Sequence, residues 1–127
     1  MRFPYILRHG QLYPIIPITL IRNGRAIDTY ALLDSGASVS LFQSEMAEAL
    51  GLELEEGETV ELGGIGGSIP GFQHVVTVSV GTVVIDCHIV FSRRYTGSFN
   101  IIGRQDFFRR FLITFDEVNE EVILEEA

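Results

Sequence analysis

Short β-rich runs separated by turn residues extend along almost the whole chain and restrict its fold more than any other feature. Segment 13–33, YPIIPITLIRNGRAIDTYALL, predicts two strands joined at Asn23-Gly24, a favoured hairpin turn. Pro14 and Pro17 place the first of these strands at a sheet edge, because proline cannot donate to a central ladder. Further runs rich in β-branched residues lie at 58–62, 74–80 and 82–91, the last two joined around Gly81.

Two short helical segments interrupt the strands. Residues 40–52, SLFQSEMAEALGL, contain a helix with Ser44 as its N-cap and Gly51 as its stop. Residues 103–111, GRQDFFRRF, predict a helical turn or two with one apolar face. That face consists of Phe107, Phe108 and Phe111. The chain is therefore expected to be mostly β, and a small closed or folded-over sheet would best hide its strand edges.

Size and composition describe one globular domain with an acidic surface. With 127 residues and 46% hydrophobic content, residues 1–127 are long enough for a single core. The formal net charge is 9 − 17 = −8, which argues against a nucleic-acid partner. Neither a signal-peptide core nor an apolar run of roughly 18 residues is present. We therefore expect a cytoplasmic protein with no membrane segment, or a piece of a longer polyprotein.

Metal, cofactor and thiol chemistry find little support in the residue pattern. His9, His74 and His88 are scattered without ligand spacing, so we expect no metal site and no cofactor. The only cysteine, Cys87, cannot form an internal disulfide and lies in a β-rich run, where we expect a small buried hydrophobe. The acidic run at 53–61 predicts a solvated face.

Three motifs occur along the chain, and each alone is weak evidence for a site. The first motif is ALLDSGASVSLF at 31–42, in which an apolar strand leads into Asp34 and ends at the small residues that follow. Asp-Ser-Gly also occurs in many surface turns. LGGIGGSIPGF at 62–72 is no phosphate cradle, because no Gly-Lys-Ser/Thr follows, and alone it predicts a mobile hairpin tip. NIIGRQDFF at 100–108 predicts a buried strand that ends at a glycine.

Together the three motifs resemble the retroviral aspartic proteases, or retropepsins, and also the single-domain retropepsin-like proteases of cells. LLDSGA matches the catalytic loop, GGIGG the flap and NIIGR the strand before the terminal helix, over about Pro17 to Phe115. The resemblance implies a single-domain acid protease fold, a folded-over or closed β barrel with a flap hairpin and one or two short helices. It places the catalytic loop at 34–37, the flap at about 60–72 and a C-terminal hairpin at about 112–125.

The resemblance also implies a reaction. Members of the family cleave peptide bonds with a water held between two carboxylates, which share a proton because both cannot ionise cheaply at that distance. This chain has a single Asp-Ser-Gly motif, so Asp34 would meet its symmetry mate in a C2 homodimer with the active site on the axis. We therefore expect an aspartic endopeptidase acting on a peptide or protein substrate, and an inactive monomer.

The other site residues are carried over from their places in the matching motifs. Ser35 would brace the partner's catalytic loop, Gly36 would bring its N–H to a carboxylate oxygen, and Gly103 and Arg104 would be structural. Ala37 and Ser38 would lie along the substrate backbone. Substrate pockets would be lined by Leu32, Leu41, Ile69, Phe99 and Ile101, each of which ordinary core packing explains about as well. The flap would consist of Gly63, Gly64, Ile65, Gly66 and Gly67, with Ile65 as a hydrophobic lid.

Two departures from the viral pattern bear on the dimer. Many viral members carry an acid at the Ser38 position that pairs with the arginine matching Arg104. Here Ser38 and Val39 are uncharged, so Arg104 needs another partner. The termini are also longer, and we expect LITFD and EVILE to pair with each other within one chain, with Asn119 near the tip of their hairpin.

Two non-enzymatic interpretations stay open. The chain could be a catalytically silent retropepsin-like module that dimerises or binds peptides, or a structural β-domain, which predicts a monomer with an ordered, closed tip. The intact Asp34-Ser35-Gly36 motif together with an intact glycine flap favours the enzyme, because a binding module has little need of both.

Overall fold

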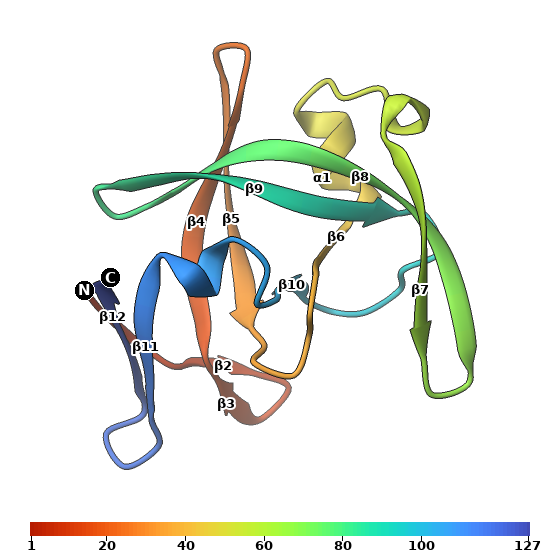
Figure 1. Cartoon of the computed structure of the whole chain (residues 1–127). Helices are drawn as coiled ribbons and strands as arrows, with labels where there is room; N and C mark the ends of the chain where they lie inside the picture. Colours follow the sequence, from red (N-terminus) through yellow and green to blue (C-terminus); the bar gives the residue numbers. More distant parts are fainter.

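The computed structural model describes residues 1–127 and consists mostly of strands, with one short α-helix (Figure 1). The strands are β1 (Arg2–Pro4), β2 (Ile6–Arg8), β3 (Gln11–Tyr13), β4 (Ile15–Arg22), β5 (Arg25–Leu33), β6 (Ser40–Gln43), β7 (Glu58–Gly64), β8 (Gly67–Val80), β9 (Val83–Ser92), β10 (Asn100–Ile102), β11 (Phe111–Asp116) and β12 (Glu121–Glu126). The helical elements are α1 (Ser44–Ala49) and the 3-10 turns η1 (Leu54–Glu56) and η2 (Phe107–Arg109). None of the helices is long and apolar enough to cross a membrane.

The largest sheet closes on itself. Its order is β4-β5-β10-β6-β9-β8-β7, and β4 also pairs with β8, so a ring forms from which β7 projects as one arm of a hairpin. The predicted mostly β, closed fold is confirmed. The edge position predicted for β4 is wrong over Thr19 to Ile21, which pair with β8 as well as with β5. Pro17 is tolerated because it lies in the half of β4 that has β5 as its only neighbour.

Local turn chemistry fixes the first hairpin of the ring. Asn23 and Gly24 connect β4 to β5 with φ values of 48° and 79°. Two successive residues with positive φ are typical of a type I′ turn, whose twist matches that of paired strands. The predicted hairpin is confirmed.

The interior of the ring is filled by side chains that alternate along the strands. Ile16 and Leu20 of β4, Phe42 of β6 and Phe91 of β9 are completely buried. Because successive side chains of a strand point to opposite faces, the residues before and after an inward-pointing residue point to solvent or to a second layer of the protein. The core therefore holds the ring shut and fixes where each strand ends.

The segment before the terminal hairpin contributes two phenylalanines to the core. The predicted helix over 103–111 is only the single 3-10 turn η2, because Asp106 adopts a φ of 65° and interrupts helical geometry. Phe107 and Phe111 are buried with ring centroids 5.0 Å apart, whereas Phe108 is only half-buried. The predicted apolar face is therefore right for two of its three phenylalanines.

The predicted helix within 40–52 is confirmed as α1, but its N-cap is not Ser44. Gln43 is the N-cap, in extended conformation and without a side-chain cap hydrogen bond, while Ser44 is the buried first residue of the helix. The pairing of β6 with β9 ends at Gln43, and the helix follows at once. The helix therefore begins one residue earlier than it would with Ser44 as its N-cap. Gly51 follows the helix with a φ of 72°, as expected for its stop.

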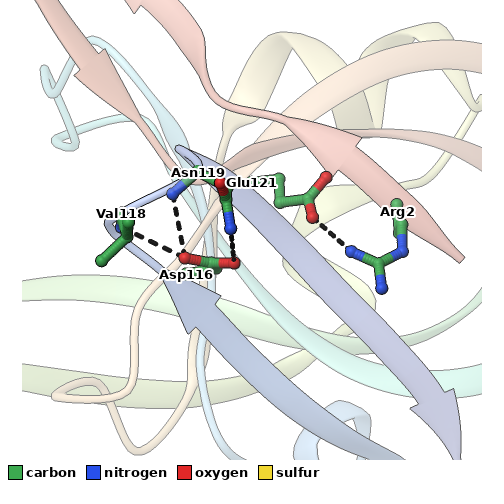
Figure 2. A network of polar contacts seen from close by, with 5 residues as sticks. All are labelled: Arg2, Asp116, Val118, Asn119 and Glu121. Atoms are coloured by element: carbon green, nitrogen blue, oxygen red, sulfur yellow. Dashed lines mark hydrogen bonds and ion pairs between the residues drawn. The ribbon is translucent and has the colours of Figure 1, made fainter.

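The two ends of the chain form their own three-stranded sheet, in the order β1-β12-β11. Residues of LITFD pair with residues of EVILE within one chain, which confirms the predicted terminal hairpin. At its tip the Asp116 carboxylate accepts hydrogen bonds from the Asn119 N–H at 3.0 Å and Nδ2 at 2.8 Å, which hold the pKa of Asp116 below its usual value (Figure 2). Arg2 of β1 forms an ion pair with Glu121 of β12 (Figure 2).

Candidate active site

Asp34 follows directly on β5, at the point where two parallel strands end together. Residues 31–33 of β5 run parallel to 100–102 of β10, so the loops that follow both strands begin side by side. The Asp34 N–H donates to the Ile102 carbonyl at 2.9 Å, and the Ala37 N–H donates to the Asp34 carbonyl at 3.2 Å. These bonds hold the half-buried carboxylate at the end of the strand pair.

The carboxylate itself is oriented by its own loop. The Gly36 N–H donates to Asp34 Oδ1 at 2.9 Å. A Cβ on Gly36 would lie 3.3 Å from the same oxygen, so a larger residue would crowd this contact. The role proposed for Gly36 from the resemblance therefore has a geometric basis. The Ser35 hydroxyl is exposed and forms no hydrogen bond within the chain, which leaves it free to bond to another molecule.

Gly103 ties the two loops together. Its N–H donates to Ser40 Oγ at 3.1 Å, and the next N–H groups, of Arg104 and Gln105, donate to the carbonyls of Ala37 and Ser38 at 2.8 and 3.1 Å. A Cβ on Gly103 would lie 2.8 Å from the Ala37 carbonyl oxygen and still closer to the Val39 carbonyl. Only glycine allows this approach, so NIIGR positions ALLDSGA through its backbone.

Three of the predicted pocket residues lie side by side next to this loop. Ile101 of β10 is in register with Leu32 of β5 on one side and with Leu41 of β6 on the other. All three are half-exposed, whereas the alternate residues of these strands are buried in the core. The three side chains form an apolar strip on the face opposite the buried residues, and Leu32 shares a surface depression with Asp34.

The other two predicted pocket residues lie further out. Phe99 is half-buried, packs against Tyr13 in a tilted arrangement with ring centroids 4.9 Å apart and lines a surface depression together with Leu32. Ile69 belongs to β8, opposite Leu62 of β7, and is not brought against Asp34.

The glycine motif forms a long hairpin, as its sequence predicts. Residues 58–64 of β7 pair with 67–73 of β8, and the turn holds Ile65 fully exposed. Gly66 and Gly67 have φ values of 94° and 128°, a conformation that favours glycine. In Figure 1 the tip of this hairpin points to the same side of the molecule as the loop after β5.

A surface depression of about 430 Å³ opens beside Asp34 and Ser35 and includes residues that the sequence did not point to. It is lined by Tyr5, Leu12, Pro14, Leu32, Leu33, Asp34, Ser35, Phe115 and Glu117. Four of these, Tyr5, Leu12, Phe115 and Glu117, come from the terminal extensions. No motif marks these four residues. The only sequence signals for them were the longer termini and the predicted pairing of LITFD, which contains Phe115, with EVILE.

Tyr5 links the two terminal extensions within this depression. Its Oη is enclosed and forms no hydrogen bond of normal geometry. Burial, together with the neighbouring carboxylates of Glu117 and Asp116, raises the pKa of Tyr5 far above its usual value. The tyrosine is therefore a neutral wall of the depression.

Cys87 is excluded as a nucleophile by its surroundings. It is 3% exposed, and burial raises the pKa of its thiol to about 12. The neutral thiol stabilises the fold below the unfolded-state pKa, and this contribution is lost as pH rises toward 12.

At pH 8 we expect an alkylating reagent to label Cys87 of the native protein about 10³-fold more slowly than Cys87 of the unfolded protein. The rate of labelling can be followed by mass spectrometry. Equal rates for the native and the unfolded protein would contradict the burial of Cys87.

No group of three or more His, Cys, Asp or Glu side chains is arranged to hold a metal ion. His88 is the only histidine paired with an acid, through Nδ1 to Asp106 Oδ2 at 2.9 Å.

Comparison with protein families gives one match, to a family described as aspartyl protease, over residues 16–105. The matched region begins in β4 and ends just after Arg104, so it contains LLDSGA, GGIGG and NIIGR and omits β1 to β3 and the terminal hairpin. A search of curated proteins gave no match.

Proposed function

Because the chain belongs to the aspartyl protease family, we propose that it is a retropepsin-like aspartic endopeptidase that works as a homodimer. The observation that carries the proposal is the Asp34 loop. Its carboxylate is half-buried, oriented by the Gly36 N–H and fastened to the end of β10. Such a preorganised acid is what proton transfer to and from a reacting group requires.

The reaction needs a second acid at the same water. In the proposed dimer, Asp34 of one protomer accepts a proton from the water while Asp34 of its partner, protonated, donates one toward the substrate carbonyl. Water oxygen bonds to the carbonyl carbon, and the C–N bond then breaks as the amine takes up a proton. The Ser35 hydroxyl, free within its own chain, is available to brace the partner's loop.

The shape of the protomer supports dimerisation through one side. The Asp34 loop, the β2–β3 hairpin, the β11–β12 turn and the β7–β8 tip all lie toward the lower side in Figure 1. Large apolar side chains are exposed on three of these elements: Leu7 and Leu12, Val118, and Ile65. Since β11 pairs with β12 and β12 with β1 in one chain, the proposed interface uses hairpin tips, not interleaved terminal strands.

The half-exposed residues beside the loop supply the proposed substrate pockets. Leu32, Leu41 and Ile101 offer an apolar strip, which favours apolar side chains near the scissile bond. Ile65 would close over the peptide from the flap and bury its exposed side chain there.

A dilution experiment tests the dimer. We expect the cleavage rate per protomer to fall on dilution in step with the dimer fraction measured by sedimentation, because a protomer holds half of the acid pair. Excess Asp34→Asn protein should inhibit wild-type enzyme by forming mixed dimers. Undiminished activity from a monomer would contradict the proposal.

Glu117 offers a check on the alternative of an intrachain acid pair, since it lines the same depression as Asp34. If Glu117→Gln abolished cleavage in a monomeric enzyme, the second carboxylate would lie in the same chain and the dimer mechanism would be wrong.

A further inference from the structure

A second depression, of about 570 Å³, includes residues of the loop after Asp34 and two arginines. Its lining consists of Ser38, Val39, Arg104, Gln105, Asp106 and Arg109. Positive charge gathered at one place stands out in a chain with a net charge of −8. An acidic ligand would be repelled by most of this surface and attracted here.

The two arginines in this depression have no acidic partner. The ion pairs of the chain are Arg2–Glu121, His88–Asp106 and Arg93–Glu55, and neither Arg104 nor Arg109 takes part in one. The only acid in the lining, Asp106, contacts His88: its Oδ2 accepts from the His88 N–H at 2.7 Å and lies 2.9 Å from His88 Nδ1, while its Oδ1 forms no hydrogen bond. Two guanidinium groups against one carboxylate leave the depression with a net positive charge, and neither arginine is held in an ion pair.

The depression is attached to the catalytic loop through the backbone. Arg104 and Gln105 donate their N–H groups to the carbonyls of Ala37 and Ser38, at 2.8 and 3.1 Å. Ser38, which lies four residues after Asp34 in the same loop, lines the depression, so the depression adjoins the loop that carries the proposed catalytic acid. A substrate side chain a few residues away from the scissile bond is therefore the part of a bound peptide that the arginines would meet.

We propose that this depression binds an aspartate or glutamate side chain of the substrate, a few residues away from the scissile bond. The inference rests on the proposed function and adds a substrate class to it: peptides with an apolar centre and an acidic flank. A guanidinium group matches a carboxylate with two parallel N–H···O bonds, which gives geometry as well as charge. The uncharged Ser38 and Val39 leave these groups free, since no acid of the loop occupies them.

Binding to the Asp34→Asn variant tests this inference independently of cleavage. The probes are two fluorescein-labelled peptides with the same apolar centre, flanked on both sides by glutamate in one and by glutamine in the other. Fluorescence anisotropy should show about 10-fold tighter binding of the glutamate peptide at low salt. The difference should shrink as salt is raised, because exposed charges are screened.

Arginine variants locate the effect. Arg104→Gln combined with Arg109→Gln should remove the preference for glutamate and leave binding of the glutamine peptide unchanged. Arg94→Gln is the matched control, because Arg94 is exposed, forms no ion pair and does not line the depression. Thermal melting should show all variants folded.

The outcomes separate this inference from the proposed function. Equal binding of the two peptides, binding of neither, or a preference that survives in the double arginine variant would each overturn the acidic subsite. Cleavage by wild type with no glutamate preference leaves the protease proposal standing while the subsite fails. A glutamate preference without cleavage by wild type supports the subsite and counts against the enzyme.

Discussion

Replacing Asp34 by asparagine is expected to lower peptide cleavage by about 10³-fold or more while leaving the fold intact. Asparagine keeps the shape of the side chain and still offers an oxygen to the Gly36 N–H, which donates to Asp34 Oδ1 at 2.9 Å. Asparagine cannot take a proton from the water that attacks the substrate carbonyl. In a homodimer one substitution removes both acids, so no half of the site survives.

A peptide mixture analysed by mass spectrometry between about pH 4 and 7 provides the measurement. Asp86→Asn is the matched control, because this exposed acid on β9 bonds only to Thr77 Oγ1, at 2.8 Å, and lies outside the catalytic loop. Equal cleavage by wild type and Asp34→Asn would remove Asp34 from the mechanism. No cleavage by either, with a firm dimer in sedimentation, would favour a peptide-binding module.

Replacing Gly103 by alanine is expected to destabilise the protein by about 3 kcal/mol and to abolish cleavage. The added Cβ would meet the carbonyl oxygens of Ala37 and Val39, which are backbone atoms and cannot rotate away. Either Gly103 or the catalytic loop must shift, and both movements break the bond from the Arg104 N–H to the Ala37 carbonyl. The melting temperature should fall by roughly 10 °C or more.

Gly63→Ala is the matched control for this effect. A Cβ at Gly63 meets nothing within 4 Å, and Gly63 is absent from the glycines with positive φ. Its melting temperature should therefore stay close to that of wild type. Calorimetry gives the melting temperature of both variants. Similar melting temperatures for Gly103→Ala and Gly63→Ala would show that Gly103 is not in close contact with the carbonyl groups of the Asp34 loop.

Features that depend on neighbouring residues could be predicted well from the sequence. The Asn23-Gly24 turn needs two residues of positive φ, the glycine hairpin needs its pliable tip, and burial of Phe107 and Phe111 follows from their spacing. The helix start was missed by one residue, because the pairing of β6 with β9 outweighs the capping preference of Ser44. Local rules fail where a long-range pairing has already fixed the backbone.

Features that join distant segments could not be predicted in this way. The second ladder of β4 with β8, the addition of β1 to the terminal hairpin and the placement of Tyr5 beside Asp34 connect residues far apart in the chain. Hydrophobic periodicity gives a strand its inner face but does not name its neighbour. The sequence showed that the N-terminus is longer, but it did not indicate that Tyr5 and Leu12 would lie in a depression with Asp34.

Residue types and their spacing were enough to indicate the candidate groups: one Asp-Ser-Gly motif, a glycine hairpin and a glycine-arginine pair. The close contact of Gly103 with the Asp34 loop, and the lack of ion pairs at Arg104 and Arg109, became visible only in the folded chain. Residue type sets what a group can do, whereas contacts across the closed sheet set what it faces.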